Sequence, residues 1–174
     1  MLYQLSDVLT MEGKTESASI SLELESLDTA MGHYPVLDKT PVELQFSYLE
    51  KGKAKACGTC SVTFGASCDR CLTDTKVSLD LKIDRILTVE GEDDGEEGTE
   101  DFYFLDGTVL DVEAFVHNEI IVNWPVKILC KEDCKGVCPV CGQNLNEREC
   151  GCDTFVPDPR MAVIKDIFCA DKEV

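Results

Sequence analysis

Residues 130–152 read CKEDCKGVCPVCGQNLNERECGC, and this stretch decides how the chain is held together. It carries six of the eleven cysteines in a chain of 174 residues. Within it, residues 138–142 read CPVCG, the pattern of a zinc knuckle, in which two thiolates separated by two residues bind one ion from a tight turn. Gly142 permits the positive φ that brings backbone N–H groups toward the sulfur atoms. The stretch therefore predicts a structural metal centre rather than a reactive one.

A zinc ion in a structural site takes four ligands, so the cysteines can be assigned to sites by counting. The simplest grouping places a first zinc ion on Cys138, Cys141, Cys150 and Cys152. The cysteines left over would then complete a second zinc site made of Cys68, Cys71, Cys130 and Cys134. A different grouping, with one ion only, uses Cys130, Cys134, Cys138 and Cys141. The sequence thus predicts one structural zinc and leaves the second ion and the grouping open.

Two C-x-x-C pairs lie outside this stretch, and their settings differ. Cys68 and Cys71 follow a predicted strand and precede a polar segment, so they lie at a turn where their thiols can converge. Cys57 and Cys60 lie inside the predicted strand, where residues three apart point to opposite faces of a sheet. We interpret Cys60 as a small core residue and Cys57 as incidental, although a bulge at Gly58 would let the pair converge.

Alternation of apolar and polar residues predicts that the first half of the chain is β-sheet. The alternation is clearest over residues 17–24, 42–48, 53–68 and 77–89. Residues 50–53 fit a hairpin turn, and a local bulge is expected near residues 84–85, where Arg85 interrupts an apolar face. Residues 29–41 contain one glycine and two prolines, and they are predicted to form a connection.

Helical spacing of apolar residues begins after Asp111, which is placed to cap a helix over about residues 111–122. A second helix is predicted to start at Asp158 and to carry Cys169 near its end. Residues 90–101 hold eight acids, three glycines and no apolar residue, so they are predicted to form an acidic loop.

The predicted fold class is α+β. An antiparallel β-rich part is followed by a helix, a cysteine-rich zinc segment and a C-terminal helix. We expect two domains. The first, residues 1–125, is the β-rich domain with the acidic loop and the helix. The second, residues 126–174, is the zinc-binding segment with the last helix, packed on the first domain.

The charge of the chain is unusual. It has 34 acidic and 16 basic residues and a net charge of −18, which two four-cysteine zinc sites would bring to about −22. Such a surface repels nucleic acid and anionic membranes and favours a basic partner. No secretory signal and no apolar run long enough to span a membrane is visible. Closely spaced cysteines in such a chain indicate metal binding in a reduced cytoplasm rather than disulfides.

No enzyme is predicted. A catalytic zinc ion keeps an open position and mixes cysteine with other ligands, whereas the ligands here are all cysteine. The two histidines, His33 and His117, have no nucleophile beside them, and His117 is expected to be a surface or packing residue on its helix. No phosphate-binding glycine loop is present.

The order of these motifs resembles that of the YceD family, the large ribosomal RNA subunit accumulation proteins of bacteria and plastids. The resemblance rests on the residue ranges 68–72, 119–125, 130–146, 150–152 and 158–162. It implies a role in the accumulation or processing of large-subunit ribosomal RNA, and it implies no known enzymatic activity. Cys57, Cys60 and Cys169 fall outside the family pattern.

The net charge bears on how such a role would be performed. The basic patch at Lys51, Lys53 and Lys55 is small, so the chain is a poor candidate for binding RNA directly. We therefore expect a basic ribosomal or rRNA-processing protein as partner, with residues 90–101 as a candidate contact, and leave direct RNA contact open. The alternative function is a zinc-binding adaptor, or a regulator that responds to metal or redox state through exposed thiolates.

Overall fold

The computed structural model describes residues 1–30, 32–89 and 104–152. Its contacts divide the chain into two compact units. The β unit consists of Met1–Ser67 and Asp74–Ile128. The cysteine unit consists of Cys68–Thr73 and Leu129–Val174, of which residues 129–152 are described in its second segment. Residues 68–73 are therefore grouped with the cysteine-rich segment, whereas the boundary expected at residue 125 leaves them with the β-rich part.

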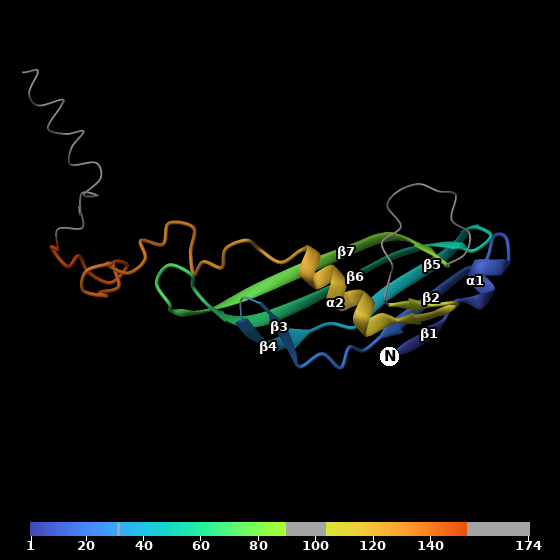
Figure 1. The fold of residues 1–174 in the computed structure, drawn as a ribbon, viewed down its shortest axis with the longest axis horizontal. Coiled ribbons are helices and arrows are strands. Elements are labelled where there is room, and N and C mark those ends of the chain that lie inside the picture. The colour runs from blue at the N-terminus through green and yellow to red at the C-terminus, as the bar shows by residue number, and fades with distance from the viewer. Residues whose placement is uncertain (31, 90–103, 153–174) are drawn as a thin grey trace, which may run out of the picture. The chain divides into compact units, whose positions relative to one another are not determined.

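The β unit is built around a six-stranded sheet in which every pairing is antiparallel (Figure 1). Its strands are β2 (Thr15–Ile20), β3 (Ser26–Thr29), β4 (Gly32–Lys39), β5 (Val42–Glu50), β6 (Lys53–Ser67) and β7 (Asp74–Thr88). β6 pairs with β7 along its whole length on one edge. Its other edge is shared, first by β5 and then by β4. The 15-residue strand β6 is thus the centre of the sheet.

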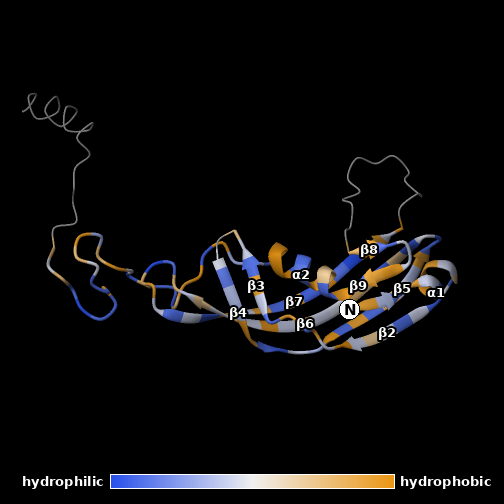
Figure 2. Ribbon diagram, turned by 60° about the horizontal axis from the view of Figure 1, so that its bottom comes forward, coloured by the Kyte–Doolittle hydropathy of each residue, from blue (hydrophilic) through white to orange (hydrophobic). Residues whose placement is uncertain are grey.

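The alternation predicted for β6 is confirmed. Alternate side chains such as Ala54, Val62 and Phe64 are buried in the core, while the residues between them are more exposed. Figure 2 colours the ribbon by hydropathy and shows hydrophobic and hydrophilic residues interspersed along the strands. The register with β7 runs through Gly58 without a shift, so there is no bulge there. A Cβ atom at Gly58 would lie 2.7 Å from Leu44 Cδ2 of β5. Glycine is needed here because β5 passes so closely.

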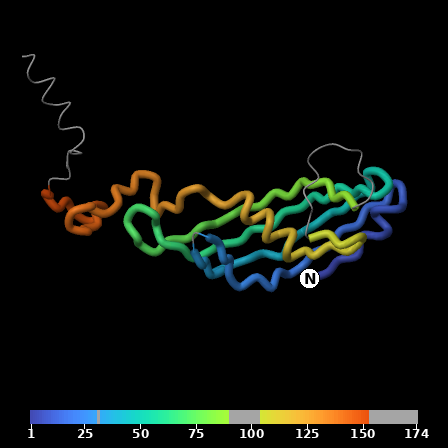
Figure 3. The backbone as a smooth tube through the Cα atoms, viewed as in Figure 1, coloured from blue at the N-terminus to red at the C-terminus, as the bar shows by residue number. Residues whose placement is uncertain are grey.

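A second, three-stranded sheet contains β1 (Leu2–Gln4), β8 (Leu105–Asp106) and β9 (Val109–Asp111), with β9 in the middle. Figure 3 shows the blue N-terminal segment beside the yellow segment that leads into α2, which is the β1–β9 pairing. The short helix α1 (Ser6–Thr10) follows β1.

Helix α2 (Val112–Val122) begins where the sequence predicts. Asp111 Oδ1 accepts hydrogen bonds from the backbone N–H groups of Glu113, at 3.1 Å, and Ala114, at 3.4 Å. Phe115 and Ile120 are fully buried in the core that the helix shares with the two sheets. The helix and the sheets thus enclose a single core in the β unit.

Two local predictions are wrong. Residues 29–41 are not a connection, because β3 and β4 form an antiparallel hairpin there. Pro35 is tolerated because the pairing of β4 with β6 starts one residue later, at Val36, so the missing N–H breaks no bond to β6. No bulge occurs at residues 84–85 either, since Arg85 pairs with Ala56 in an unbroken register.

The polar residue Arg85 is tolerated on an apolar face because it has a buried partner. Its Nε donates a hydrogen bond to Oε1 of Glu119 at 2.6 Å. Glu119 is on α2 and is only 3% exposed. The ion pair therefore joins β7 to the helix that covers the sheet.

The described part of the chain is mostly antiparallel β-sheet with two helices, which fits the α+β class. The predicted strand 17–24 ends at Ile20, although Leu22 is still buried. The predicted acidic loop 90–101, the C-terminal helix and Cys169 lie outside the described residues. Within the described ranges, no helix combines the length and apolar character needed to cross a membrane.

Candidate metal centre

The structure gathers eight cysteines of the cysteine unit into two groups of four. In each group the four sulfur atoms lie within 4.8 Å of one another. The Cys138 cluster consists of Cys138, Cys141, Cys150 and Cys152. The Cys68 cluster consists of Cys68, Cys71, Cys130 and Cys134. These are the two groups obtained from the sequence by counting four ligands for each ion. The other grouping, Cys130 and Cys134 with Cys138 and Cys141, is not found in the residues described.

The first half of the Cys138 cluster is a tight turn over residues 138–142. The N–H of Gly142 donates to the carbonyl of Cys138 at 2.9 Å, and the N–H of Cys138 donates to the carbonyl of Gln143 at 2.9 Å. Gly142 has a φ of 73°, the left-handed conformation expected of it. The N–H of Val140 points at Cys138 Sγ from 3.4 Å. This is the knuckle turn predicted from the sequence, with a backbone donor directed at a sulfur.

The Cys68 cluster starts with a second turn that repeats these hydrogen bonds. The N–H of Leu72 donates to the carbonyl of Cys68 at 2.9 Å, and the N–H of Cys68 donates to the carbonyl of Thr73 at 2.9 Å. Leu72 takes the place of the knuckle glycine and has a φ of 59°. Residues 68–72 are therefore a second knuckle, and aligning CDRCL with CPVCG would have identified it from the sequence.

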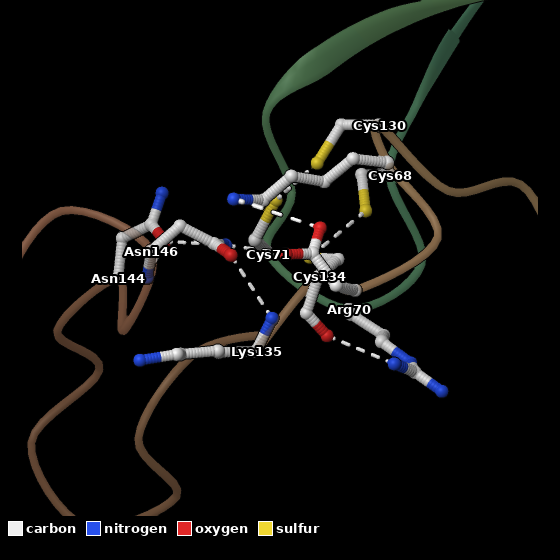
Figure 4. Close-up of polar contacts among 10 residues, drawn as sticks. Cys68, Arg70, Cys71, Cys130, Cys134, Lys135, Asn144 and Asn146 are labelled. Atoms are coloured by element: carbon white, nitrogen blue, oxygen red, sulfur yellow. Dashed lines mark hydrogen bonds and ion pairs between the residues drawn. The ribbon is translucent and has the colours of Figure 1, made fainter.

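The other two cysteines of the Cys68 cluster come from the segment 130–137, which lies against this second knuckle. The N–H of Val137 donates to the carbonyl of Arg70 at 3.0 Å, and Arg70 Nη1 donates to the carbonyl of Cys134 at 2.8 Å (Figure 4). Gly136 has a φ of 78°, and a Cβ atom on it would lie 3.0 Å from the Arg70 carbonyl oxygen. Backbone contacts thus bring together two segments that are far apart in the sequence.

The donor set fits a tetrahedral metal ion. The Cys68 and Cys134 sulfur atoms are 3.8 Å apart, and those of Cys71 and Cys130 are 3.5 Å apart. Four sulfur atoms around a zinc ion at about 2.3 Å would be about 3.8 Å from one another. The cysteines are free thiols at these separations. Both clusters consist of cysteine alone, so no histidine or carboxylate completes either one within the described residues.

Burial and local hydrogen bonds together shift the pKa values of the clustered thiols. Burial raises the pKa of Cys68, but backbone N–H donors, that of Cys130 first, lower it to about 6. Backbone N–H donors, that of Cys141 first, likewise lower the pKa of Cys138 to about 7. The hydrogen bond to Cys71 is the main reason that the pKa of Cys130 is raised to about 12. A cation bound by these thiolates would displace the protons that remain.

The two cysteines of strand β6 belong to neither cluster. Cys60 is buried in the core of the β unit, and burial raises the pKa of its thiol to about 11. Cys57 is on the opposite face, with its sulfur 3.9 Å from Asp84 Oδ1. Cys60 is therefore a core residue, as predicted. His33 belongs to neither cluster, and its Nδ1 lies 2.6 Å from Asp28 Oδ1 in the β3–β4 hairpin.

Sequence reasoning missed the residues that support the ligands. Arg70 holds the Cys134 backbone, and the side chain of Asn146 donates to Cys134 Sγ at 3.3 Å. The sequence carried a partial signal for Asn146, because it lies in the loop between two ligand pairs, but nothing in it indicates which ligand the side chain reaches.

Fold and site together define a class of protein in which an antiparallel β-sheet unit carries a module of two four-cysteine clusters. The family model for the large ribosomal RNA subunit accumulation protein YceD matches residues 56–168, which include all eight clustered cysteines. This match covers more than half of the chain, and the chain belongs to the YceD family.

A curated relative agrees with this assignment. The chain is 27% identical over 147 residues to the large ribosomal RNA subunit accumulation protein YCED homolog 1, chloroplastic, of Arabidopsis thaliana. The aligned region covers 68% of this chain and 45% of that protein, so the chain spans less than half of the relative's length. No solved structure matches the chain.

Proposed function

We propose that this protein is a non-enzymatic factor that supports the accumulation or processing of large-subunit ribosomal RNA, and that two structural zinc ions hold its cysteine unit together. Family membership and the name of the plant relative support the ribosomal role. The observation that carries the zinc role is the pair of four-cysteine clusters, in each of which the four sulfur atoms lie within 4.8 Å of one another.

Zinc is the ion that these clusters suit best. Four thiolates on knuckle turns, with backbone N–H groups directed at sulfur, form the donor set of structural zinc sites. When bound, the ion cross-links the segments that supply its ligands. Iron also binds four thiolates, so metal analysis must identify the ion as well as count it.

A structural role follows from the ligand count. Four cysteines fill the coordination of a zinc ion and leave no position for water or substrate, which a catalytic zinc site keeps open. The zinc ions would therefore act on folding: they would order segments of the cysteine unit that have few apolar side chains of their own.

A basic protein is the partner that the charge favours. At a net charge of −18 the chain repels the phosphates of RNA, and zinc bound by four thiolates makes the charge still more negative. The proposed partner is a ribosomal or rRNA-processing protein, and residues 90–101, rich in acids, are the proposed contact. Because thiolate clusters need a reducing compartment, we place the protein in the cytoplasm.

Cells that lack the protein test the ribosomal role. We expect large-subunit ribosomal RNA to fall relative to small-subunit RNA, and expression of the chain in these cells to restore it. Variants with Cys68 and Cys71 changed to serine, or Cys138 and Cys141, should restore it less well. A Cys57→Ser variant, which alters a cysteine outside the clusters, should restore it fully. An unchanged RNA ratio in the depleted cells would overturn the proposal.

One observation favours a second candidate, a regulator that responds to metal or redox state. Cys130 and Cys141 are exposed, one in each cluster, so an oxidant can reach both sites. Under this alternative, mild oxidant would release zinc reversibly and change which proteins the chain captures. Retention of zinc under oxidant with unchanged partners would leave the structural role as the better account.

A further inference from the structure

The loop between Cys141 and Cys150 folds back on the segment that supplies a ligand to the other cluster. The N–H of Leu145 donates to the carbonyl of Gly136 at 2.9 Å, and Val137 forms an antiparallel bridge with Asn144. Both ends of this loop are ligands of the Cys138 cluster. The middle of the loop therefore lies beside residues 134–137, next to a ligand of the Cys68 cluster.

Asn146 makes the direct connection. Its Oδ1 accepts a hydrogen bond from the N–H of Lys135 at 2.9 Å, and its Nδ2 donates to Cys134 Sγ at 3.3 Å (Figure 4). The orientation of the amide is fixed by chemistry, because a backbone N–H needs an oxygen as acceptor. With its oxygen on Lys135, the amide must direct its N–H₂ group at the sulfur.

The side chain of Asn146 is also held from within its own loop. Asn144 Oδ1 accepts from the backbone N–H of Asn146 at 3.0 Å and from its Nδ2 at 2.9 Å. The loop thus determines where the amide points. If the ends of the loop at Cys141 and Cys150 were released, the amide would lose the support that aims it at Cys134.

We propose that Asn146 couples the two metal clusters, so that an ion in the Cys138 cluster increases the affinity of the Cys68 cluster for its own ion. This inference rests on the proposed function, since it requires both clusters to bind zinc. Binding in the Cys138 cluster fixes Cys141 and Cys150 and thereby orders the loop that carries Asn146. The ordered amide then donates to Cys134, a ligand of the other ion.

The hydrogen bond has a clear electrostatic effect. Four thiolates around a divalent ion leave a net charge of about −2, and an N–H directed at one sulfur offsets part of it. Loss of such an outer partner typically lowers metal affinity by about 10- to 100-fold. Coupling is reciprocal, so an ion in the Cys68 cluster increases the affinity of the Cys138 cluster by the same factor.

The test measures zinc retention in each cluster of the full-length, zinc-loaded protein. Samples are equilibrated with increasing chelator, alkylated, and mapped by mass spectrometry, so that each cysteine reports the chelator concentration at which it loses protection. Cys57 lies outside both clusters and serves as the internal standard for reactivity. Cys134 reports the Cys68 cluster, and Cys138 reports the other.

Three variants form a double-mutant cycle with the wild type. They are Asn146→Ala, the pair Cys150→Ser with Cys152→Ser, and the combination of all three changes. We expect Asn146→Ala to lower the chelator concentration that exposes Cys134 by about tenfold. The serine pair should lower it as well, and the combination should add little to the larger single effect, because both changes remove the same interaction.

Two further variants distinguish loss of the hydrogen bond to sulfur from general misfolding of the loop. Asn146→Asp keeps an oxygen for the Lys135 N–H but directs no donor at the sulfur, so it should lose protection at Cys134 at least as strongly as Asn146→Ala. Gln143→Ala removes a neighbouring amide that donates to the Asn144 carbonyl and not to sulfur, and it should behave as wild type.

An Asn146→Ala protein that protects Cys134 as well as the wild type would overturn the coupling. The coupling would also be overturned if the fold-decrease in chelator concentration for the combined variant equalled the product of the fold-decreases for Asn146→Ala and the serine pair. If the wild type protects both clusters in either case, the zinc proposal stands and only the coupling fails. If the wild type protects neither cluster, the zinc proposal itself fails, and the coupling fails with it.

Discussion

Leu72 makes the Cys68 knuckle hard to recognise in the sequence, because a knuckle usually has glycine at this position. In the Cys68 knuckle it occupies the position that Gly142 occupies in the Cys138 knuckle, with the same backbone hydrogen bonds. Its φ of 59° is in the left-handed region, and it is the one non-glycine residue with positive φ in the part of the chain described. The leucine side chain is 70% exposed, so packing contributes little to offset the strain. Such a conformation costs about 1 kcal/mol.

Replacing this leucine should therefore stabilise the knuckle. Asparagine tolerates the left-handed region, so Leu72→Asn should raise the free energy of unfolding of the metal-loaded protein by about 0.5–1 kcal/mol. Leu49→Asn is the matched control, because Leu49 is also exposed but is in strand β5, where asparagine is unfavourable. Chemical denaturation of both variants measures the difference. A lower stability for Leu72→Asn would show that the leucine has a role that its backbone and exposure do not reveal.

At the scale of elements, the sequence predicted strands and helices best where one strong pattern was present and no residue indicated a different structure. Strand β6 and helix α2 were predictable because alternation or a capping aspartate marked them clearly. β4 was missed because Gly32 and Pro35 are typical of connections, and only the register with its neighbours shows why they are tolerated. The partner of Arg85 was unpredictable as well, since Glu119 is 34 residues away and the pairing depends on how α2 packs on β7.

The Arg85–Glu119 pair supports a prediction about how the helix is held. Arg85→Met leaves the Glu119 carboxylate buried without its cation, and we expect the free energy of unfolding of the β unit to fall by about 2–3 kcal/mol. The one tryptophan, Trp124, packs on Tyr34 and Phe64, so its fluorescence reports unfolding of this unit in urea.

Two controls accompany this prediction. Lys55→Met breaks the exposed Lys55–Asp84 pair and should change stability by less than about 0.5 kcal/mol. The double variant Arg85→Met with Glu119→Leu removes the buried charge too and should recover most of the loss. Equal effects of Arg85→Met and Lys55→Met would mean that the buried pair contributes no more than a surface one.

At the scale of the whole molecule, the two units are built around different kinds of buried side chain. The apolar core lies in the β unit. In the cysteine unit, the side chains that are buried together are those of Cys68, Cys71 and Cys134. The Cys68 cluster joins residues that are 59 and 66 positions apart in the chain. An ion bound in this cluster would close a long loop and so remove much of the conformational freedom of the unfolded chain.

Counting could suggest the cysteine groups from the sequence, because four ligands complete one zinc ion and the surplus cysteines need partners. Counting could not identify the residues that hold these groups in place. Arg70, Gly136 and Asn146 act through contacts between segments that come together only in the folded chain. The net charge of −18 likewise follows directly from the sequence. Which part of the surface contacts a partner does not follow from the charge alone.

The central claim is that two structural zinc ions hold the cysteine unit together. Protein purified without chelators under reducing conditions should contain two equivalents of zinc, measured by elemental analysis. Alkylation of the same sample should spare the eight clustered cysteines and label Cys57. Less than half an equivalent of metal, or free labelling of both clusters, would contradict the account.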